Sequence, residues 1–356
     1  MKSGQALHPA REVHSDNLPE LLNHLNCSLV VTTYQAGQVL CIGQANGQIK
    51  FGFTQFRQAM GVCRSPTGLA LATKHEIWTL QGQKDIAAYI EPKNTYDIAF
   101  LTRSSHITGP VMAHDVAWCN GEIIFVNTLC NCLATIGRSW SFSPTWRPPF
   151  IKEATPGDCC HLNGLAVSQD GSYPAYVTMH AATAAESQWR ENKKNGGLIM
   201  NVQTNEVVVS DLSMPHSPRL YQNQLYVLNS GEGQLLRIDQ ANGDRTIIAE
   251  LPGYTRGLDF VGNTAIVGLS RVRESAIFGG LSVADKHEQL RCGLALVDLS
   301  SGNLQGFCWF ETGVEELFAI SVIPGYLNPI VVGPESKAND NDEKSQTIWS
   351  IPSPPT

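Results

Sequence analysis

One pattern recurs along the chain: a polar residue, a short apolar run, a turn, and a second apolar run that ends on small polar residues. Each apolar run has the length of a strand, so each copy predicts an antiparallel strand pair. Further strand pairs joined by Asn-Gly or Ser-Gly turns lie between the copies. The copies are GLALATKHEIWTL, HDVAWCNGEIIFVNT, HLNGLAVSQDGSYPAYVTM, HSPRLYQNQLYVLNS, RGLDFVGNTAIVGLS and LFAISVIPGYLNPIVVG.

This repeat predicts an all-β protein that forms a single β-propeller. Each unit amounts to about four strands in roughly 40–55 residues, which is typical of propeller blades. Arranging the sheets around a ring is one way in which so many antiparallel strands protect their edges. Helical periodicity is nearly absent, and one short helix is expected over residues 17–26.

The number of blades depends on how the chain ends are counted. CSLVVTTYQAGQVLCIGQANGQIKFGF, near the N-terminus, is a partial seventh unit. Seven blades result if this unit stands alone, and six result if it joins the C-terminal strands expected at residues 318–332 and 347–351. We favour seven, and either count predicts that N- and C-terminal strands close the ring. Residues 1–26 are then an N-terminal extension with the short helix, and residues 27–356 form the propeller domain.

Composition excludes several classes of partner. The net charge of −7 and the pI of about 5.8 disfavour nucleic acid. No run reaches the roughly 18 apolar residues that span a bilayer, and the N-terminus lacks the apolar segment of a secretory signal. The ten cysteines lie mostly inside apolar runs, which indicates buried free thiols in a reducing compartment. We therefore expect a cytoplasmic protein that binds neither nucleic acid nor membranes.

Polar residues begin and end the strand pairs, and propeller geometry brings them to one face. In a blade, the innermost strand runs away from this face and the next strand returns to it. The residues that begin the first strands are His114, His161, His216, Arg256 and Glu316. The residues that end the second strands are Asn127, Thr128, Thr178, Met179, His180, Asn229, Ser230, Ser270 and Arg271. The sequence therefore predicts a polar site at one mouth of the central channel.

Three histidines occupy equivalent positions in three successive blades. Because equivalent positions around a ring converge on its axis, His114, His161 and His216 predict a metal site, with zinc or iron as the ion. His216 also lies between Pro215 and Pro218, which restrict the backbone on both sides of it. The alternatives are a metal-free polar pocket and histidines that only hydrogen-bond neighbouring loops.

Further residues complete the predicted site. Glu316 is the candidate general base, and Arg256 is the candidate clamp for an anionic group. Asn163 lies two residues after His161 and shares its face of the strand. The candidates for substrate binding are Asn163, Arg219, Asn229, Ser230 and Arg271.

Alternative roles exist for several of these charged residues. The arginines are equally expected to form ion pairs with carboxylates such as Asp259, Glu274 or Glu315. Asp115 is expected either to orient the ring of His114 or to point into the blade.

Several motifs together resemble a known family: HDVAW, CHLNGLAV, SMPHSPR, LNSGEG, RGLDF and VEELF. They are similar to an uncharacterised bacterial family classed as a domain of unknown function, whose members sometimes stand beside or are fused to tetratricopeptide repeats. The resemblance implies a tetratricopeptide-repeat protein as a candidate partner and implies no activity. More distantly, the chain resembles gluconolactonase and NHL-type propellers, although none of their metal-ligand motifs matches residue by residue.

Two functions are consistent with these patterns. The first is a metal-dependent hydrolase, lyase or oxygenase acting on a small polar molecule or a peptide side chain. In it, a metal held by His114, His161 and His216 polarises an oxygen or activates a water. The second is a non-catalytic propeller that binds a ligand or a protein on the same face. The sequence contains no GxSxG, Walker, Rossmann or HExxH motif, which removes several familiar enzyme classes.

Overall fold

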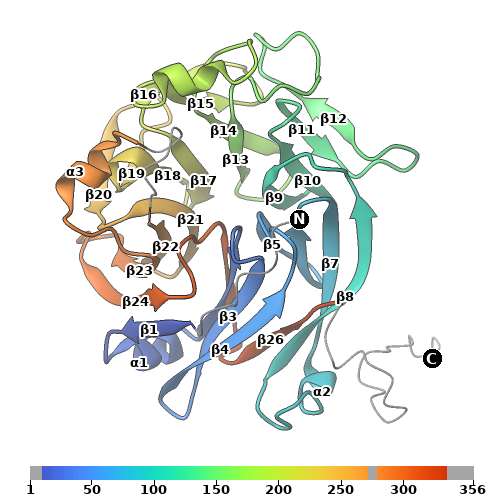
Figure 1. Ribbon diagram of the computed structural model, residues 1–356, viewed down its shortest axis with the longest axis vertical. Helices are drawn as coiled ribbons and strands as arrows, with labels where there is room; N and C mark the ends of the chain where they lie inside the picture. Colours follow the sequence, from blue (N-terminus) through green and yellow to red (C-terminus); the bar gives the residue numbers. More distant parts are fainter. Residues whose placement is uncertain (1–9, 272–278, 335–356) are drawn as a thin grey trace.

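Six β-sheets stand around a central channel in the computed structural model, which describes residues 10–271 and 279–334 (Figure 1). In each sheet the strands follow one another from the channel outward, as in a propeller blade. The innermost strands contact one another from blade to blade around the whole ring. The predicted all-β propeller is therefore confirmed, whereas the preference for seven blades is wrong and the alternative of six is right.

The seventh blade is absent because the last predicted strand pair is divided between two sheets. LFAISVIPGYLNPIVVG forms β25 (Ile320–Pro324) and β26 (Pro329–Val332). β25 is the innermost strand of the blade that the N-terminal strands build, and β26 pairs in parallel with β8 (Ile98–Ile107) of the next blade. The Asp97 carboxylate accepts two backbone N–H groups from the intervening turn and so holds it against that blade. The strand expected at residues 347–351 lies outside the described residues.

The blades follow the chain order, and strands from near both ends close the first of them. Blade 1 contains β25, β2 (Cys27–Thr33), β3 (Gln38–Ala45) and β4 (Gln48–Gln55). Blade 2 contains β5 (Val62–Ser65), β6 (Gly68–Ala72), β7 (Glu76–Gln83), β8 and β26. Blade 3 contains β9 (Ala113–Cys119), β10 (Glu122–Asn127), β11 (Cys132–Thr135) and β12 (Ser143–Trp146).

The other three blades complete the ring. Blade 4 contains β13 (Leu162–Val167), β14 (Pro174–Met179), β15 (Gly197–Asn201) and β16 (Val207–Leu212). Blade 5 contains β17 (Pro215–Tyr221), β18 (Gln224–Asn229), β19 (Gln234–Ile238) and β20 (Arg245–Glu250). Blade 6 contains β21 (Tyr254–Val261), β22 (Thr264–Ser270), β23 (Gly293–Asp298), β24 (Leu304–Thr312) and β1 (Arg11–His14).

The residues before β2 pack on the propeller. β1 pairs with the outermost long strand of blade 6, and the predicted short helix is α1 (Leu18–His24), with Pro19 in its first turn. Leu18 and Leu22 of this helix are buried against the apolar residues between blades 1 and 6. The other short helices are α2 (Lys84–Ala87), η1 (Gln188–Asn192), η2 (Ser230–Glu232) and α3 (Ser282–Lys286).

Blades pack face to face, so many strands are apolar on both faces rather than alternating. β22, for example, is buried along its whole length. Gly164 on β13 shows how close two inner strands come: a Cβ atom there would lie 2.4 Å from both Pro218 Cδ and Thr178 Oγ1. Only glycine permits this approach of blades 4 and 5.

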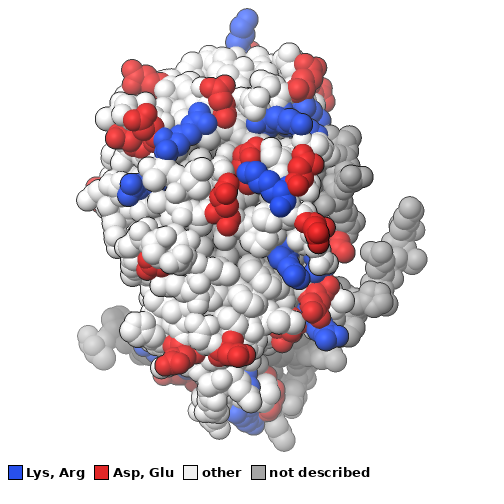
Figure 2. Space-filling model, turned by 90° about the vertical axis from the view of Figure 1, so that its left-hand side faces the viewer, with Lys and Arg blue, Asp and Glu red and all other residues white. Residues whose placement is uncertain are grey.

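The surface carries no block of positive charge on the face shown in Figure 2, where acidic and basic side chains intermingle between wide uncharged areas. This mixed pattern agrees with the small share of charged residues. Within the described residues, no helix is long and apolar enough to cross a membrane.

The thiols are expected to be unreactive in the folded protein. All ten cysteines are free and eight are buried, and burial raises the pKa of Cys27, Cys41 and Cys132 to about 12. Because the thiolate is the reactive form, a thiol reagent at neutral pH should modify at most the half-buried Cys159 quickly, and all ten cysteines after denaturation. Several disulfides in protein from its native source would contradict the predicted cytoplasmic location.

Candidate functional site

Four imidazoles form a row at the end of the channel where the inner strands of blades 3 to 5 begin. His114 lies on β9, His161 precedes β13, His216 lies on β17, and His180 follows β14. The ring centroids of neighbours along this row, from His114 through His161 and His180 to His216, are 4.9, 4.4 and 5.0 Å apart. The three predicted histidines are therefore brought together, and a fourth stands between the last two.

The backbone fixes two of these rings in the same way. His114 Nδ1 lies 3.0 Å from the carbonyl oxygen of Met112, and His216 Nδ1 lies 2.9 Å from that of Met214. Both methionines have positive φ angles, 52° and 47°. Because a carbonyl oxygen only accepts hydrogen bonds, we assign the ring proton to Nδ1 in each histidine. In a neutral ring, Nε2 is then an unprotonated acceptor.

Three histidines of the row are kept neutral by their surroundings. Burial lowers the pKa of His114, His180 and His216 well below the usual value, and nearby positive groups that include Arg256 lower it further. Within residues 10–271 and 279–334, no hydrogen bond reaches Nε2 of His114 or His216. At neutral pH both rings therefore present a lone pair without a protein partner.

The remaining predicted histidine is held by a carboxylate. Asp158 lies 3.0 and 3.1 Å from His161 Nδ1 and also accepts a hydrogen bond of 3.1 Å from Trp189 Nε1. Trp189 belongs to η1, in the insertion between β14 and β15, and its ring lies 4.3 Å from that of His161 and 4.9 Å from that of His180. This tryptophan packs on two rings of the row and belongs to a buried apolar cluster with Ala181, Met214, Tyr254, Leu281 and Val283.

Arg256 and Glu316, the predicted catalytic pair, lie at the other side of the row. Arg256 Nη1 and Glu316 Oε1 are 3.0 Å apart, and the guanidinium carbon lies 3.6 Å from the centroid of the Phe318 ring. A narrow cavity of about 10 Å³, with room for about one water molecule, lies between Arg256 and the imidazoles of His114 and His216. The residues that line it include His114, Asn163, His216, Ser217, Arg256 and Phe318.

Arg219 also reaches this cavity, but its guanidinium is occupied by the protein. It donates two hydrogen bonds to Asp115, of 2.8 and 3.2 Å, and others to the carbonyl oxygens of Leu165, Pro218 and Leu258. Asp115 in turn accepts the backbone N–H groups of Val116 and Leu165. Asp115 therefore binds the inner strands of blades 4 and 5 rather than the ring of His114, and the pair ties together the inner strands of blades 3 to 6.

The other predicted substrate-binding residues differ in what their side chains contact. Asn229 and Arg271 hydrogen-bond to neighbouring loops and strands: Asn229 to a backbone N–H and a glutamine, and Arg271 to two carbonyl oxygens of β24. Ser230 Oγ lies 3.1 Å from His216 Nδ1 and so supports that ring. Asn163 accepts a hydrogen bond of 2.7 Å from Thr178 and lines the cavity. Asn163 thus remains at the site.

The placement of the imidazoles does not fit the predicted metal ion. No group of three or more His, Cys, Asp or Glu side chains in the described residues has a geometry that could hold one. Among the predicted ligands, His114 and His161 stand edge to face with rings 81° apart, and His180, which is not a predicted ligand, stacks on His161 at 30°. An unprotonated Nε2 atom can bind a metal ion, but the imidazole rings here stand in a row instead of surrounding one point.

Sequence reasoning missed four of the groups that build this site. His180 was placed at the channel mouth as the end of a second strand, but it was given no role there. Trp189 and Asp158 lie in irregular segments, and Phe318 was noted only as the start of a strand. The available signal was at His180: the corresponding residues of blades 3 and 5 are the hydroxyl residues Thr128 and Ser230, so an imidazole there departs from both neighbouring blades.

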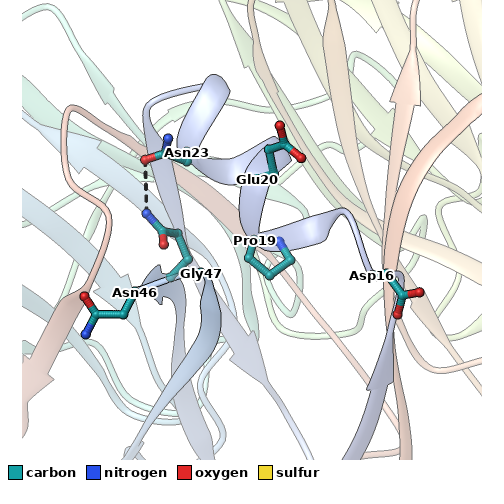
Figure 3. Close-up of a pocket in the computed structure, with 7 residues that line it drawn as sticks. Asp16, Pro19, Glu20, Asn23, Asn46 and Gly47 are labelled. Carbon is teal, nitrogen blue, oxygen red and sulfur yellow. Dashed lines mark hydrogen bonds between the residues drawn. The ribbon is translucent and has the colours of Figure 1, made fainter.

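A second hollow lies beside α1 and has the character of an ordinary surface depression. It is lined by Asp16, Pro19, Glu20, Asn23, Gln44, Asn46 and Gly47. Its labelled side chains lie spread around it, with Asp16 on the far side from Asn46 (Figure 3). Its polar groups therefore do not converge as the imidazoles do.

Comparison with known proteins agrees with this fold. Among solved structures, the chain is similar to one in a nidogen/laminin complex, with 9% identity, a TM-score of 0.50, and coverage of 84% of this chain and 99% of the other. It also matches a catalytically inactive virginiamycin B lyase from Staphylococcus aureus with quinupristin (11% identity, TM-score 0.40, coverage 84% and 99%). A third match is TolB from Acinetobacter baumannii, with 9% identity, a TM-score of 0.49, and coverage of 84% of this chain and 66% of the other. The likeness to the chain of the nidogen/laminin complex shows the fold alone.

The family assignment comes from the sequence. No curated protein matches the chain. The family described as Domain of unknown function (DUF4915) matches residues 16–332, nearly the whole of the described propeller. The motifs that suggested an uncharacterised family, from HDVAW to VEELF, all lie within this match. The chain belongs to the DUF4915 family.

Proposed function

We propose that the imidazole row is the active site of an enzyme that performs acid–base catalysis on a small polar molecule at the channel mouth. The observation that carries this proposal is the anchoring of His114 and His216 through Nδ1, which leaves two neutral rings with an unprotonated Nε2. A neutral imidazole with a fixed tautomer is the usual general base at neutral pH.

The neighbouring groups support the same chemistry. The Met112 and Met214 carbonyl oxygens face Nδ1 and stabilise the positive charge that each ring gains when Nε2 takes a proton. Arg256 supplies a buried positive charge for a negative charge that develops on the substrate, with Glu316 as its counter-ion in the resting state. Trp189 packs on His161 and His180 and shields one face of each of these rings from bulk water.

A transition-metal site is the second candidate, because one observation favours it. Metal-binding histidines usually donate the proton of their other nitrogen to a carbonyl or carboxylate, and His114, His161 and His216 all have such a partner at Nδ1. Such a site requires the rings of His114, His161 and His216 to turn so that their Nε2 atoms converge. The metal content of protein purified without an affinity tag decides between the two candidates. A stoichiometric metal supports the metal site. The absence of metal, with no gain in activity when metal is added back, supports the metal-free site.

The proposed enzyme is tested by incubating the protein with a small-molecule cell extract and following the compounds by mass spectrometry. The wild type should consume at least one small polar compound. His216→Ala should lower that rate by about 10²–10⁴-fold, the usual contribution of a general base. His75→Ala is the control and should keep the rate, because His75 lies in the turn between β6 and β7 of blade 2 and its ring makes no contact with the row in the described residues.

Two results would contradict the proposed enzyme. A rate that survives His216→Ala places the chemistry elsewhere. A compound that the wild type retains without changing it supports the alternative of a non-catalytic ligand-binding propeller. The tetratricopeptide-repeat partner and the cytoplasmic location stay predictions from the sequence.

A further inference from the structure

The turn before β13 brings Asp158 against the ring of His161, three residues later in the chain. Both residues have positive φ angles, 44° and 50°, which are uncommon outside glycine and cost free energy. The turn is held in this shape because Asn131 Oδ1 accepts the backbone N–H groups of Cys159 and Cys160, at 2.7 and 3.3 Å. The fold therefore maintains a strained turn that places a carboxylate on the His161 ring.

Blade 4 differs at this point from the blades on either side of it. In blades 3 and 5, Nδ1 of the histidine at the start of the inner strand faces a backbone carbonyl oxygen, that of Met112 or Met214. In blade 4, Nδ1 of His161 faces a carboxylate instead, at 3.0 and 3.1 Å. A carboxylate is the stronger acceptor, and it also stabilises the positive charge that a ring gains when its other nitrogen takes a proton.

The indole of Trp189 restricts how Asp158 can be used. Its Nε1 donates to Asp158 Oδ2 at 3.1 Å, and its ring lies 4.3 Å from that of His161. Trp189 is 1% exposed, so its N–H depends on this acceptor. Asp158 thus faces two N–H groups, and a carboxylate can satisfy both because it only accepts. The ring proton of His161 therefore belongs on Nδ1, which leaves Nε2 unprotonated in the neutral ring.

His161 is also one of the more accessible members of the row. Its ring stands between those of His114 and His180, with centroids 4.9 and 4.4 Å away. His114 and His161 are half-buried, whereas His180 and His216 are buried. A small molecule at the channel mouth therefore finds more of His161 accessible than of His180 or His216.

We infer that His161 is a further proton acceptor of the row and that Asp158 is its positioning residue, an inference that rests on the proposed function. Asp158 keeps the proton on Nδ1 and so directs the lone pair of Nε2 to the substrate. When Nε2 takes a proton, the bond between that proton and the substrate breaks and its electron pair stays on the substrate. The carboxylate stabilises the resulting imidazolium until Nε2 returns the proton to the product.

The substitution Asp158→Asn tests this role through the position of the ring proton. An amide has one oxygen, which the N–H of Trp189 occupies, so its NH₂ group faces Nδ1 of His161. Nδ1 must then accept, and the proton of the neutral ring moves to Nε2. The ¹⁵N NMR spectrum of the His161 side chain at neutral pH should show the proton on Nδ1 in the wild type and on Nε2 in Asp158→Asn.

A double variant separates this hydrogen-bond role from a general loss of structure. Trp189→Phe removes the competing N–H, so in Asp158→Asn with Trp189→Phe the amide can turn its oxygen toward His161, and the proton should return to Nδ1. Trp189→Phe alone should leave the proton on Nδ1. A wild-type proton on Nε2, alone or together with one on Nδ1, overturns the inference. So does a His161 tautomer that is unchanged in Asp158→Asn, or a double variant that keeps the proton on Nε2.

Turnover in the extract assay distinguishes this inference from the proposed function. Asp158→Asn should lower the rate by about 10²–10⁴-fold, because the ring then presents a protonated Nε2 to the substrate. The double variant should recover part of that rate. A rate that depends on His216 and survives Asp158→Asn overturns the inference and leaves the proposed function standing. A wild type that consumes nothing contradicts the proposed function, whereas the ring proton still decides whether Asp158 positions His161.

Discussion

Replacing Asp115 by alanine is expected to lower the free energy of unfolding by about 3–5 kcal/mol, the range for breaking a buried ion pair by removing one partner. The Asp115 side chain is 5% exposed and accepts hydrogen bonds from both Arg219 and two backbone N–H groups. Its loss leaves the Arg219 guanidinium without its counter-ion and the N–H of Leu165 without an acceptor. Chemical denaturation followed by tryptophan fluorescence measures the change.

A double variant separates the ion pair from the rest of the packing. Asp115→Leu with Arg219→Met removes both charges, so it should recover at least half of the stability that Asp115→Ala loses. A loss below about 1 kcal/mol for Asp115→Ala, in the range of an exposed pair, would show that this pair does not hold the inner strands together.

The protein is also expected to lose stability steeply as the pH falls below about 6.5, the ordinary pKa of histidine in an unfolded chain. Burial lowers the pKa of His114, His180 and His216 in the folded protein. Below pH 6.5 the unfolded chain therefore binds protons at these three positions that the folded chain does not bind. Stability then falls with decreasing pH by up to about 4 kcal/mol per pH unit until the folded protein also takes up protons.

Denaturation curves at a series of pH values measure this slope. His180→Phe removes one of the three protons, so its slope should be about one third smaller than that of the wild type. Burial raises the pKa of Asp259, so the protonation of this carboxyl group opposes the loss of stability at lower pH. Its contribution is the same in wild type and His180→Phe and therefore does not affect the difference between their slopes. A slope that is the same in wild type and His180→Phe would show that His180 is not held neutral by the fold.

The sequence was sufficient for the architecture because the repeat is local. Each copy from HDVAW onward contains its own turn and its own apolar strands, and these become β9 with β10, β13 with β14, and so on. The blade count failed where pairing is not local. β25 and β26 are five residues apart in the chain yet belong to different sheets, and the contact that separates them comes from Asp97, more than two hundred residues earlier.

For the candidate site, too, the residues at repeated positions could be predicted from the sequence and the long-range contacts could not. His114, His161 and His216 were found because equivalent positions of a ring must meet. The engagement of Arg219 was not predictable, since its partner Asp115 lies 104 residues away in the chain. Trp189 was missed because it lies in an insertion, where no repeat indicates which residue turns inward.

The most direct test of the central claim is the ¹⁵N NMR spectrum of the histidine side chains at neutral pH, since the claim is that His114 and His216 present neutral imidazoles with Nε2 as an open acceptor. The structure predicts that His114 and His216 are neutral, with the proton on Nδ1 and none on Nε2. Protonation of both nitrogens, or a proton on Nε2 alone, would contradict the proposed general base and remove the basis of the active site.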